Sequence, residues 1–378
     1  MYDSVEPYVN GRAWIEIELD ALAHNVAELR SRLPAGCDIM AIVKADAYGH
    51  GAERIAARLQ KEGVKSFAVA TVGEGICLRK SGLIGDILVL GYTHPKDVSF
   101  LSGFRLSQLV TDRAYANELN ETGYELSVHI AIDTGLHRLG METSMFDDIE
   151  SVYSCKNLTV QGVATHLAAS DSLDSGDLEF TNTQIERFYT VVNALKGKGY
   201  DVGTLHVQAS YGIYNHPGIV CDYARAGIAL YGVLSQNGET RIKPDLQPVL
   251  SLRALIAQVR WIEAGESVSY NRTYTTDRQM KLATVGIGYA DGVPRQMSGN
   301  GGVCIVHGSK VPIVGRICMD LLMLDVTGID NVATGDVVTL IGKDSGEEIR
   351  CEDVAEASGT ITNDILCRLG RRLPRVYL

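Results

Sequence analysis

The chain has 378 residues, enough for two domains or for one large domain with an appendage. Its formal net charge of −11 argues against a nucleic-acid partner and against attraction to an anionic membrane surface. No stretch reaches the roughly 18 consecutive apolar residues of a transmembrane helix, and the polar segment 1–12 lacks the apolar core of a signal peptide. We therefore expect a cytoplasmic protein with no nucleic-acid partner and no membrane contact of its own.

The eight cysteines are scattered singly along the chain and form no C-x-x-C pair. They are Cys37, Cys77, Cys155, Cys221, Cys304, Cys318, Cys351 and Cys367. This spacing gives no support for a zinc site, so we expect no metal. It favours reduced thiols in the core of a cytosolic protein.

The first 230 residues alternate between strand and helix patterns. Residues 14–19 alternate as a half-buried strand, and Asp20 is expected to cap a helix that runs to about residue 33. Eight apolar strand segments follow, at 38–43, 66–71, 86–91, 106–111, 126–132, 158–165, 204–208 and 223–226. Helical segments separate most of them, at 52–62, 72–81, 113–122, 145–154 and 182–197, with a weak helix at 95–103. This alternation predicts an α/β fold, a (β/α)8 TIM-like barrel, with a doubly wound open sheet as the alternative.

After Gly232 the pattern changes. The polar segment 236–248 contains two prolines and is typical of a linker. Strand patterns then predominate, at 249–262, 281–288, 303–306, 311–314, 321–326 and 336–341, until a helical pattern at 351–358. We predict a barrel domain at 1–240 and a mostly β C-terminal domain at 241–378, with the first strand, 14–19, able to pack against the second domain.

Lys44 stands directly after the first barrel strand. A lysine at the carboxyl end of a parallel strand points into the pocket that the strands share. There its amine can lose solvent, lower its pKa and form a Schiff base with a carbonyl group; an exposed lysine at a strand end is the alternative. Other polar or cationic residues stand at the ends of later strands, namely Arg138, His166, Ser210 and Arg225. We expect all of them at one face of the barrel.

Six segments, in order along the chain, resemble bacterial alanine racemases, which are fold-type III enzymes that use pyridoxal 5'-phosphate (PLP). They are 43–51 (VKADAYGHG), 132–140 (IDTGLHRLG), 165–168 (THLA), 224–232 (ARAGIALYG), 268–270 (VSY) and 315–320 (GRICMD). The resemblance implies an amino-acid racemase with PLP bound to Lys44.

The same resemblance implies a division of roles. Lys44 would exchange the substrate proton on one face and the phenol of Tyr270 on the other. A phenol needs nearby positive charge to act as a base near neutral pH, and His166 and Arg225 match the family residues behind it. Arg225 would also face the pyridine nitrogen and keep it unprotonated, since a guanidinium holds its own proton firmly. A buried arginine in an ion pair is the alternative.

The resemblance places further residues around the cofactor and the substrate. Tyr48 and Ser210 would give hydroxyl groups to the phosphate, and the turn at Gly227 and Ile228 would give backbone N–H groups. The alternative for Gly227 and Ile228 is a tight turn with no role in binding the phosphate. Arg138 would lie near the cofactor's phenolic oxygen and the substrate carboxylate.

Met319 would reach the substrate carboxylate through its backbone N–H. Many members of the family carry a carbamylated lysine that braces the arginine, and here Ala131 stands in its place.

Asn363 stands where alanine racemases typically carry a tyrosine. Asparagine is shorter and both donates and accepts, which suits a substrate that bears a hydroxyl group. The chain therefore resembles most closely the soluble racemase domain of membrane-bound serine racemases from vancomycin-resistant bacteria. We expect racemisation of serine, and also of alanine, that supplies a D-amino acid for peptidoglycan precursors, by a protein that can be the cytoplasmic domain of a membrane-anchored parent.

The resemblance also implies a head-to-tail homodimer, in which the β domain of one chain gives Tyr270, Met319 and Asn363 to the barrel of the other. Three other functions stay open. One is an alanine racemase proper. Another is a decarboxylase of the same architecture, which Cys318 would suit. The third is a non-enzymatic PLP carrier, which is a single barrel and does not account for the residues after 240.

Overall fold

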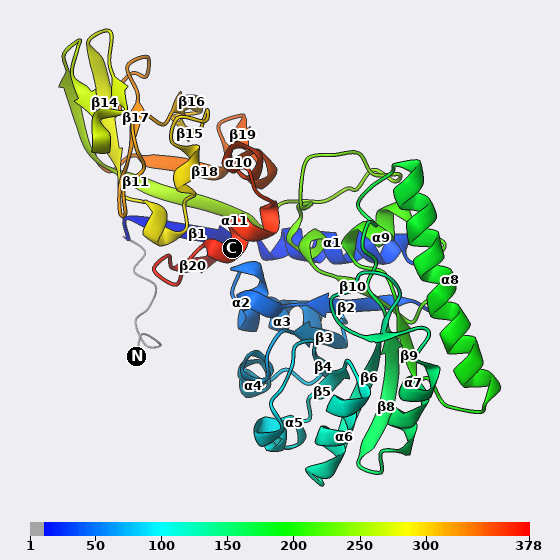
Figure 1. Ribbon diagram of the computed structural model, residues 1–378. Coiled ribbons are helices and arrows are strands. Elements are labelled where there is room, and N and C mark those ends of the chain that lie inside the picture. The colour runs from blue at the N-terminus through cyan, green and yellow to red at the C-terminus, as the bar shows by residue number, and fades with distance from the viewer. Residues whose placement is uncertain (1–10) are drawn as a thin grey trace.

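The computed structural model describes residues 11–378, and its larger half is a parallel β-barrel surrounded by helices (Figure 1). The strands are β2 (Asp38–Ile42), β3 (Ser66–Val69), β4 (Asp86–Val89), β5 (Ser107–Val110), β6 (Leu126–Asp133), β8 (Leu158–Ala164), β9 (Thr204–His206) and β10 (Tyr223–Ala226). They pair in the order β10-β2-β3-β4-β5-β6-β8-β9, and a single bridge between Ala209 and Arg225 brings the two ends together. The predicted eight-stranded barrel is confirmed, and the open sheet is wrong.

Helices follow most of the barrel strands and cover the outside of the barrel (Figure 1). They are α3 (Ala52–Lys61), α4 (Val72–Lys80), α5 (Val98–Gly103), α6 (Arg113–Glu121), α7 (Phe146–Ser151), α8 (Ser175–Gly197) and the short α9 (Ser210–Asn215). Some of these helices have one apolar side; α3, for example, buries Ile55, Ala56 and Leu59. The weak helix expected at 95–103 is a 3-10 turn at Pro95–Asp97 that continues into α5.

The helix α1 (Leu19–Arg32) begins earlier than predicted. Its N-cap is Glu18, and Asp20 lies inside the first turn. The Asp20 carboxylate accepts a hydrogen bond from Arg58 at 3.0 Å instead of binding the helix's own N–H groups. The predicted cap is therefore wrong, because the side chain has a partner on α3.

The second half of the chain is mostly β-sheet. Its strands are β11 (Leu250–Ile262), β14 (Met280–Val285), β15 (Val303–Val306), β16 (Ser309–Pro312), β17 (Leu322–Asp325), β18 (Val337–Asp344), β19 (Glu347–Ile349) and β20 (Arg375–Tyr377). Two-residue strands lie at Ser267–Val268, Tyr274–Thr275 and, beside the barrel, Met141–Glu142. The helices α10 (Cys351–Ser358) and α11 (Thr362–Arg368) precede the last strand.

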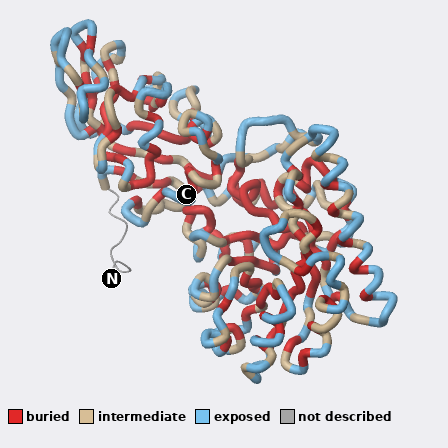
Figure 2. The backbone as a smooth tube through the Cα atoms, viewed as in Figure 1, coloured by how far each residue is buried: buried red, intermediate tan, exposed pale blue. Residues whose placement is uncertain are grey.

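The strand β1 (Ala13–Ile17) belongs to this second sheet. It pairs antiparallel with β11 and parallel with β20, so the chain crosses from the β-sheet into the barrel through α1. Buried residues run through the barrel strands and through the sheet (Figure 2).

None of the helices within residues 11–378 has the length and apolar character needed to cross a membrane. Residues 1–10, which make up most of the segment predicted to lack a signal peptide, lie outside the described residues. The cysteine prediction is partly wrong, because Cys77 and Cys367 are exposed rather than in the core.

Candidate active site

The lysine predicted to organise the site lies in an unusual backbone turn. Lys44 begins α2 (Lys44–Tyr48), yet Ala45, Asp46, Ala47 and Tyr48 all have positive φ angles, of 53°, 54°, 53° and 52°. Left-handed helical backbone costs L-residues roughly 1–2 kcal/mol each. A strained turn of this kind persists only where its surroundings hold it.

Two carboxylates hold this left-handed turn. Glu74, at the start of α4, accepts a hydrogen bond from the backbone N–H of Ala45 at 2.7 Å. Asp46 accepts one from the N–H of Ala52 at 2.8 Å, which joins the turn to the start of α3. Sequence reasoning missed Glu74; its position in a capping box with Thr71 was the only local signal.

A cavity of about 550 Å³ opens at the carboxyl ends of the barrel strands. Among the side chains that line it are nine of the eleven predicted site residues, namely Lys44, Tyr48, Arg138, His166, Ser210, Arg225, Gly227, Ile228 and Asn363. The other two, Tyr270 and Met319, do not line it.

The amine of Lys44 is half-buried at this cavity. Burial lowers the pKa of Lys44, and the nearby charge of Arg138 lowers it further. A larger fraction of the amine is therefore neutral and nucleophilic than in an exposed lysine.

Arg225, in β10, is buried and lies against carbonyl groups and imidazoles rather than a carboxylate. Its guanidinium donates to the backbone oxygens of Thr165 and His206 at 2.6 Å each and of Val207 at 3.0 Å. Burial lowers the pKa of Arg225 to about 10. The alternative of a buried ion pair is therefore wrong.

Two histidines flank this guanidinium. The Nδ1 of His166 lies 3.0 Å from Arg225, and the Nδ1 of His206 lies 3.1 Å from it. Burial, and then the charge of Arg225, lowers the pKa of His166 to about 3. The imidazole is thus neutral, and it accepts at Nδ1 and carries its proton at Nε2. The positive charge expected behind Tyr270 would come from Arg225 alone.

His206 was missed by the sequence analysis, although it ends β9 and the strand-end rule could have found it. Its Nε2 lies 2.9 Å from the Nδ1 of His129, deep in the barrel. Burial lowers the pKa of His129 to about 4 and that of His206 well below its usual value.

A small polar group of residues lines the same cavity as Lys44. The Ser210 hydroxyl accepts from the N–H of Gly227 at 3.1 Å and from that of Ala229 at 3.3 Å. A Cβ atom at Gly227 would lie 3.0 Å from the Tyr48 hydroxyl, so glycine lets this hydroxyl approach the turn.

Arg138 is exposed, and it makes no hydrogen bond or ion pair with any residue from 11 to 378. Ala131, at the position of the family's bracing lysine, is buried and lines the same cavity. Within the described chain, no side chain takes over the bracing role.

Asn363 lines the cavity of its own chain, so the expectation that it comes from a second chain is wrong. The reason is the packing of α11 on the left-handed turn: a Cβ at Gly49 would lie 2.4 Å from the Leu366 carbonyl oxygen. The Oδ1 of Asn363 is buried and has no hydrogen-bond partner among the described residues.

Tyr270 and Met319 lie on the β domain and are 64% and 53% exposed. The loops that carry them touch each other, because the Ser269 hydroxyl donates to the Arg316 carbonyl oxygen at 2.6 Å. A single chain therefore presents the phenol and the methionine together, outside the cavity that holds Lys44.

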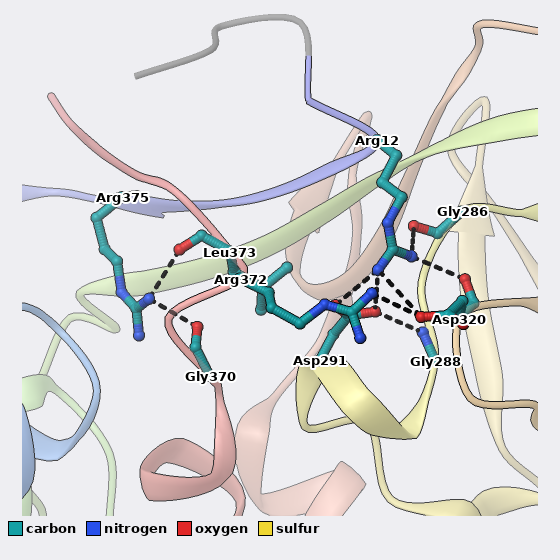
Figure 3. A network of polar contacts seen from close by, with 9 residues as sticks. All are labelled: Arg12, Gly286, Gly288, Asp291, Asp320, Gly370, Arg372, Leu373 and Arg375. Carbon is teal, nitrogen blue, oxygen red and sulfur yellow. Dashed lines mark hydrogen bonds and ion pairs between the residues drawn. The ribbon is translucent and has the colours of Figure 1, made fainter. Parts of the chain in front are cut away.

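An ion-pair network around the buried Asp291 holds Asp320, the residue that follows Met319 (Figure 3). The carboxylate of Asp291 accepts from Arg12 at 2.8 and 2.9 Å and from the N–H of Gly288 at 3.0 Å. Arg372 donates to Asp320 at 2.6 Å, and Arg12 donates to the Asp320 carbonyl oxygen at 2.7 Å. The residue next to Met319 is thus bound by two arginines.

Comparison with known proteins agrees with this architecture. The model of the alanine racemase N-terminal domain matches residues 17–235, and that of the alanine racemase C-terminal domain matches residues 249–377. An amino-acid racemase of Enterococcus faecalis is 44% identical over 363 residues, which are 96% of this chain and 51% of that protein. The chain thus spans about half the length of this relative.

Other relatives are of similar length to this chain. The alanine racemase of Geobacter sp. (strain M21) is 38% identical over 96% of this chain and 98% of its own length. The crystal structure of alanine racemase from Bartonella henselae with covalently bound pyridoxal phosphate superposes with a TM-score of 0.84, at 30% identity over 97% of this chain and 100% of that one. With both family domains matched in order over nearly its whole length, this chain belongs to the alanine racemase family.

Proposed function

We propose that this chain is a PLP-dependent racemase that interconverts the L and D enantiomers of serine and of alanine. The observation that carries the proposal is that a half-buried lysine of lowered pKa and a buried arginine line one cavity, and that this arginine has no carboxylate partner within residues 11–378. The family match and a relative with covalently bound pyridoxal phosphate support the same cofactor here.

The residues of the cavity fit PLP. Lys44 would hold the cofactor's aldehyde carbon covalently, and the hydroxyl groups of Tyr48 and Ser210, with the Gly227 turn, would hold its phosphate. Arg225 would face the pyridine nitrogen. Within residues 11–378 the hydrogen-bond partners of its guanidinium are carbonyl oxygens and two imidazoles, and none of them is an acid that would protonate that nitrogen.

The chemistry that the bound cofactor supplies is withdrawal of electrons from the Cα–H bond of an amino acid attached to it. The residues of the chain then move the proton. The amine of Lys44 would take the proton on one face, or return it as ammonium, and Tyr270 of a second chain would take it as phenolate, or return it as phenol, on the other. His166 presents its Nε2 proton on the side away from Arg225, where it can orient that hydroxyl.

The exposed apolar residues of the β domain support a homodimer with shared sites. Tyr270, Tyr289, Met319 and Leu321 are 64%, 42%, 53% and 39% exposed. Backbone hydrogen bonds keep the last three close together, because the N–H of Tyr289 and the carbonyl oxygen of Leu321 both bind Cys318, the neighbour of Met319. A patch of this kind is typical of a protein interface, and in our proposal it covers the cavity mouth of a second chain.

Asn363 supports serine as a substrate beside alanine. Its Oδ1 is a buried acceptor with no partner among residues 11–378, and an unpaired buried acceptor costs free energy that a ligand's hydroxyl group can offset. An alanine racemase proper remains the nearest alternative, because alanine has no hydroxyl to offer. The role in peptidoglycan synthesis, the link to vancomycin resistance and the location in the cell stay predictions.

A decarboxylase of the same architecture is the second candidate, and Cys318 is the residue that favours it. That cysteine is half-buried, and its sulfur lies 3.5 Å from the Ser269 hydroxyl and from the Arg316 carbonyl oxygen. The match to racemases along the whole chain favours the first candidate.

The decisive experiment measures racemisation of L-Ser and L-Ala side by side with the purified, PLP-loaded protein. We expect D-enantiomers from both, and loss of both products together with the visible absorbance of the bound cofactor in Lys44→Ala. Release of CO2 from a basic amino acid without racemisation would instead identify a decarboxylase. Racemisation of alanine alone would identify an alanine racemase proper.

A further inference from the structure

Two cysteines meet at the end of the barrel opposite the cavity. Cys37 directly precedes β2, and Cys221 precedes β10, the strand that pairs with it in parallel. Their sulfur atoms lie 3.6 Å apart, and the N–H of Asp38 donates to the carbonyl oxygen of Asp222 at 2.9 Å beside them. The backbone therefore keeps the two thiols together.

The surroundings of the pair favour oxidation. Cys37 is half-buried beside the exposed residues Ala35 and Gly36, so a small solute can reach it. The Cys221 sulfur accepts hydrogen bonds from the Cys37 thiol and from the Gln208 amide, the latter at 3.6 Å. These bonds, led by the one from Cys37, lower the pKa of Cys221, which favours its thiolate form.

No other pair of cysteines within residues 11–378 lies within hydrogen-bonding distance. Burial raises the pKa of Cys155, Cys304 and Cys351, which makes them less reactive. The exposed Cys77 and Cys367 have no second sulfur nearby and cannot form an intrachain bond in the folded protein.

We propose that Cys37 and Cys221 are an oxidative modification site, at which a hydroperoxide converts the two thiols into an intrachain disulfide. The thiolate of one cysteine of the pair attacks one peroxide oxygen, the O–O bond breaks, and the leaving oxygen takes a proton to become water or an alcohol. The sulfur of the second cysteine then attacks the sulfenic sulfur, the S–O bond breaks, and the hydroxide leaves as water with the proton of the second thiol. Two thiols lose two electrons, and the peroxide gains them.

The bond would join two strands that carry the site at their other ends. Lys44 follows β2 and Arg225 lies in β10, so the disulfide would tie together the supports of both residues. The sulfur atoms must close from 3.6 Å to about 2.05 Å, and they lie at the starts of two adjacent strands. A crosslink between residues so far apart in sequence restricts the unfolded chain and should raise the melting temperature.

The test is peptide mapping of the PLP-loaded protein after brief treatment with hydrogen peroxide and alkylation of the remaining thiols. We expect a peptide pair linked through Cys37 and Cys221, its loss on treatment with dithiothreitol, and a higher Tm for the oxidised protein than for the reduced one. The linked pair and the Tm shift should vanish in Cys37→Ser and in Cys221→Ser, and should persist in the control Cys77→Ser.

Full alkylation of both cysteines under conditions that oxidise Cys77 would overturn the proposal. So would sulfinic acid at Cys221 without a link to Cys37. Because the linked peptide is sought in the unaltered chain, the answer does not depend on whether either variant folds.

Discussion

The carboxylate of Glu74 links two backbone segments at the mouth of the cavity: one oxygen accepts from the N–H of Ala45 at 2.7 Å, and the other accepts from the N–H of Ala70 at 2.7 Å. Ala45 is the first residue of the left-handed turn and the neighbour of Lys44. The Glu74 side chain therefore holds in place the backbone next to Lys44, from which the reactive amine extends.

Replacing Glu74 should reduce catalysis more than it reduces stability. In Glu74→Gln one acceptor becomes an NH2 donor that meets a backbone N–H, and in Glu74→Ala both acceptors are lost. A hydrogen bond to a charged group contributes roughly 1.5–3 kcal/mol, so we expect kcat to fall about 10-fold or more in Glu74→Ala. Steady-state racemisation and a thermal melt measure the two effects.

The matched control is Glu53→Gln, on the exposed side of the neighbouring helix α3. It should retain the kcat of the unaltered protein. An unchanged kcat in Glu74→Ala would show that the turn holds its shape without this carboxylate.

Two inactive variants should restore each other if the site is shared between chains. In the proposed dimer each site takes Lys44 from one chain and Tyr270 from the other. Lys44→Ala removes the amine from the site in its own barrel, and Tyr270→Phe removes the phenol from the site in the partner's barrel. A mixed dimer contains one site with both groups intact. Co-refolding equal amounts should therefore restore roughly a quarter of the unaltered activity, because half of the dimers are mixed and each has one working site.

Each variant refolded on its own serves as a control and should stay inactive. If Tyr270 served Lys44 of its own chain, or had no part in proton transfer, the mixture would regain nothing beyond the activity of the separate variants. Deuterium incorporation by Tyr270→Phe, measured from each enantiomer, should then identify the face that the phenol serves.

Asn363→Tyr should shift the substrate preference toward alanine. The tyrosine ring would fill the space beside the cavity and remove the unpaired amide acceptor. Losing a partner for a substrate hydroxyl costs about 10-fold or more in kcat/KM, so the serine-to-alanine ratio of kcat/KM should fall by that factor. Arg368→Lys, on the same helix α11, should leave the ratio unchanged.

Acid should destabilise the protein through its buried histidines. Burial lowers the pKa of His50 and of His129 to about 4 and that of His166 to about 3. In the unfolded chain each histidine regains its usual pKa of about 6.5 and binds a proton that the folded chain does not. The unfolding free energy should therefore be highest above pH 6.5 and fall by up to about 1.4 kcal/mol per pH unit for each histidine below it.

Urea unfolding at several pH values between 7.5 and 5, followed by circular dichroism, measures this slope. His129→Gln should make the slope shallower, whereas His94→Gln, at an exposed position, should not change it. A slope that is the same in all three proteins would assign the acid sensitivity to other groups.

Local sequence patterns were enough to predict the barrel. Each of the eight parallel strands lies on a predicted apolar segment, and Lys44, Arg138, His166 and Ser210 all follow strands as expected. Parallel strands of a barrel share one carboxyl end, so a local rule predicts a common cavity without knowledge of any contact.

The short helices and strands were missed because they are too short to show a local pattern. The helices α9 and α11 and the strand β20 have seven residues or fewer, too few for a periodic signal. Their place depends on packing: α11 lies on the left-handed turn, and it brings Asn363 to the cavity of its own chain.

The sequence by itself determined the barrel, the family and the residue types of the site, because these follow from periodicity and from motifs that are contiguous in the chain. Only the tertiary structure decided how those residues are held. It shows the hydrogen bond between the Ala45 N–H and Glu74, the carbonyl oxygens that bind the Arg225 guanidinium, and the separation of Tyr270 from the cavity. The physical reason is that hydrogen bonds between residues distant in the chain, and the burial that shifts a pKa, depend on the three-dimensional packing of several segments, which leaves no trace in any one of them.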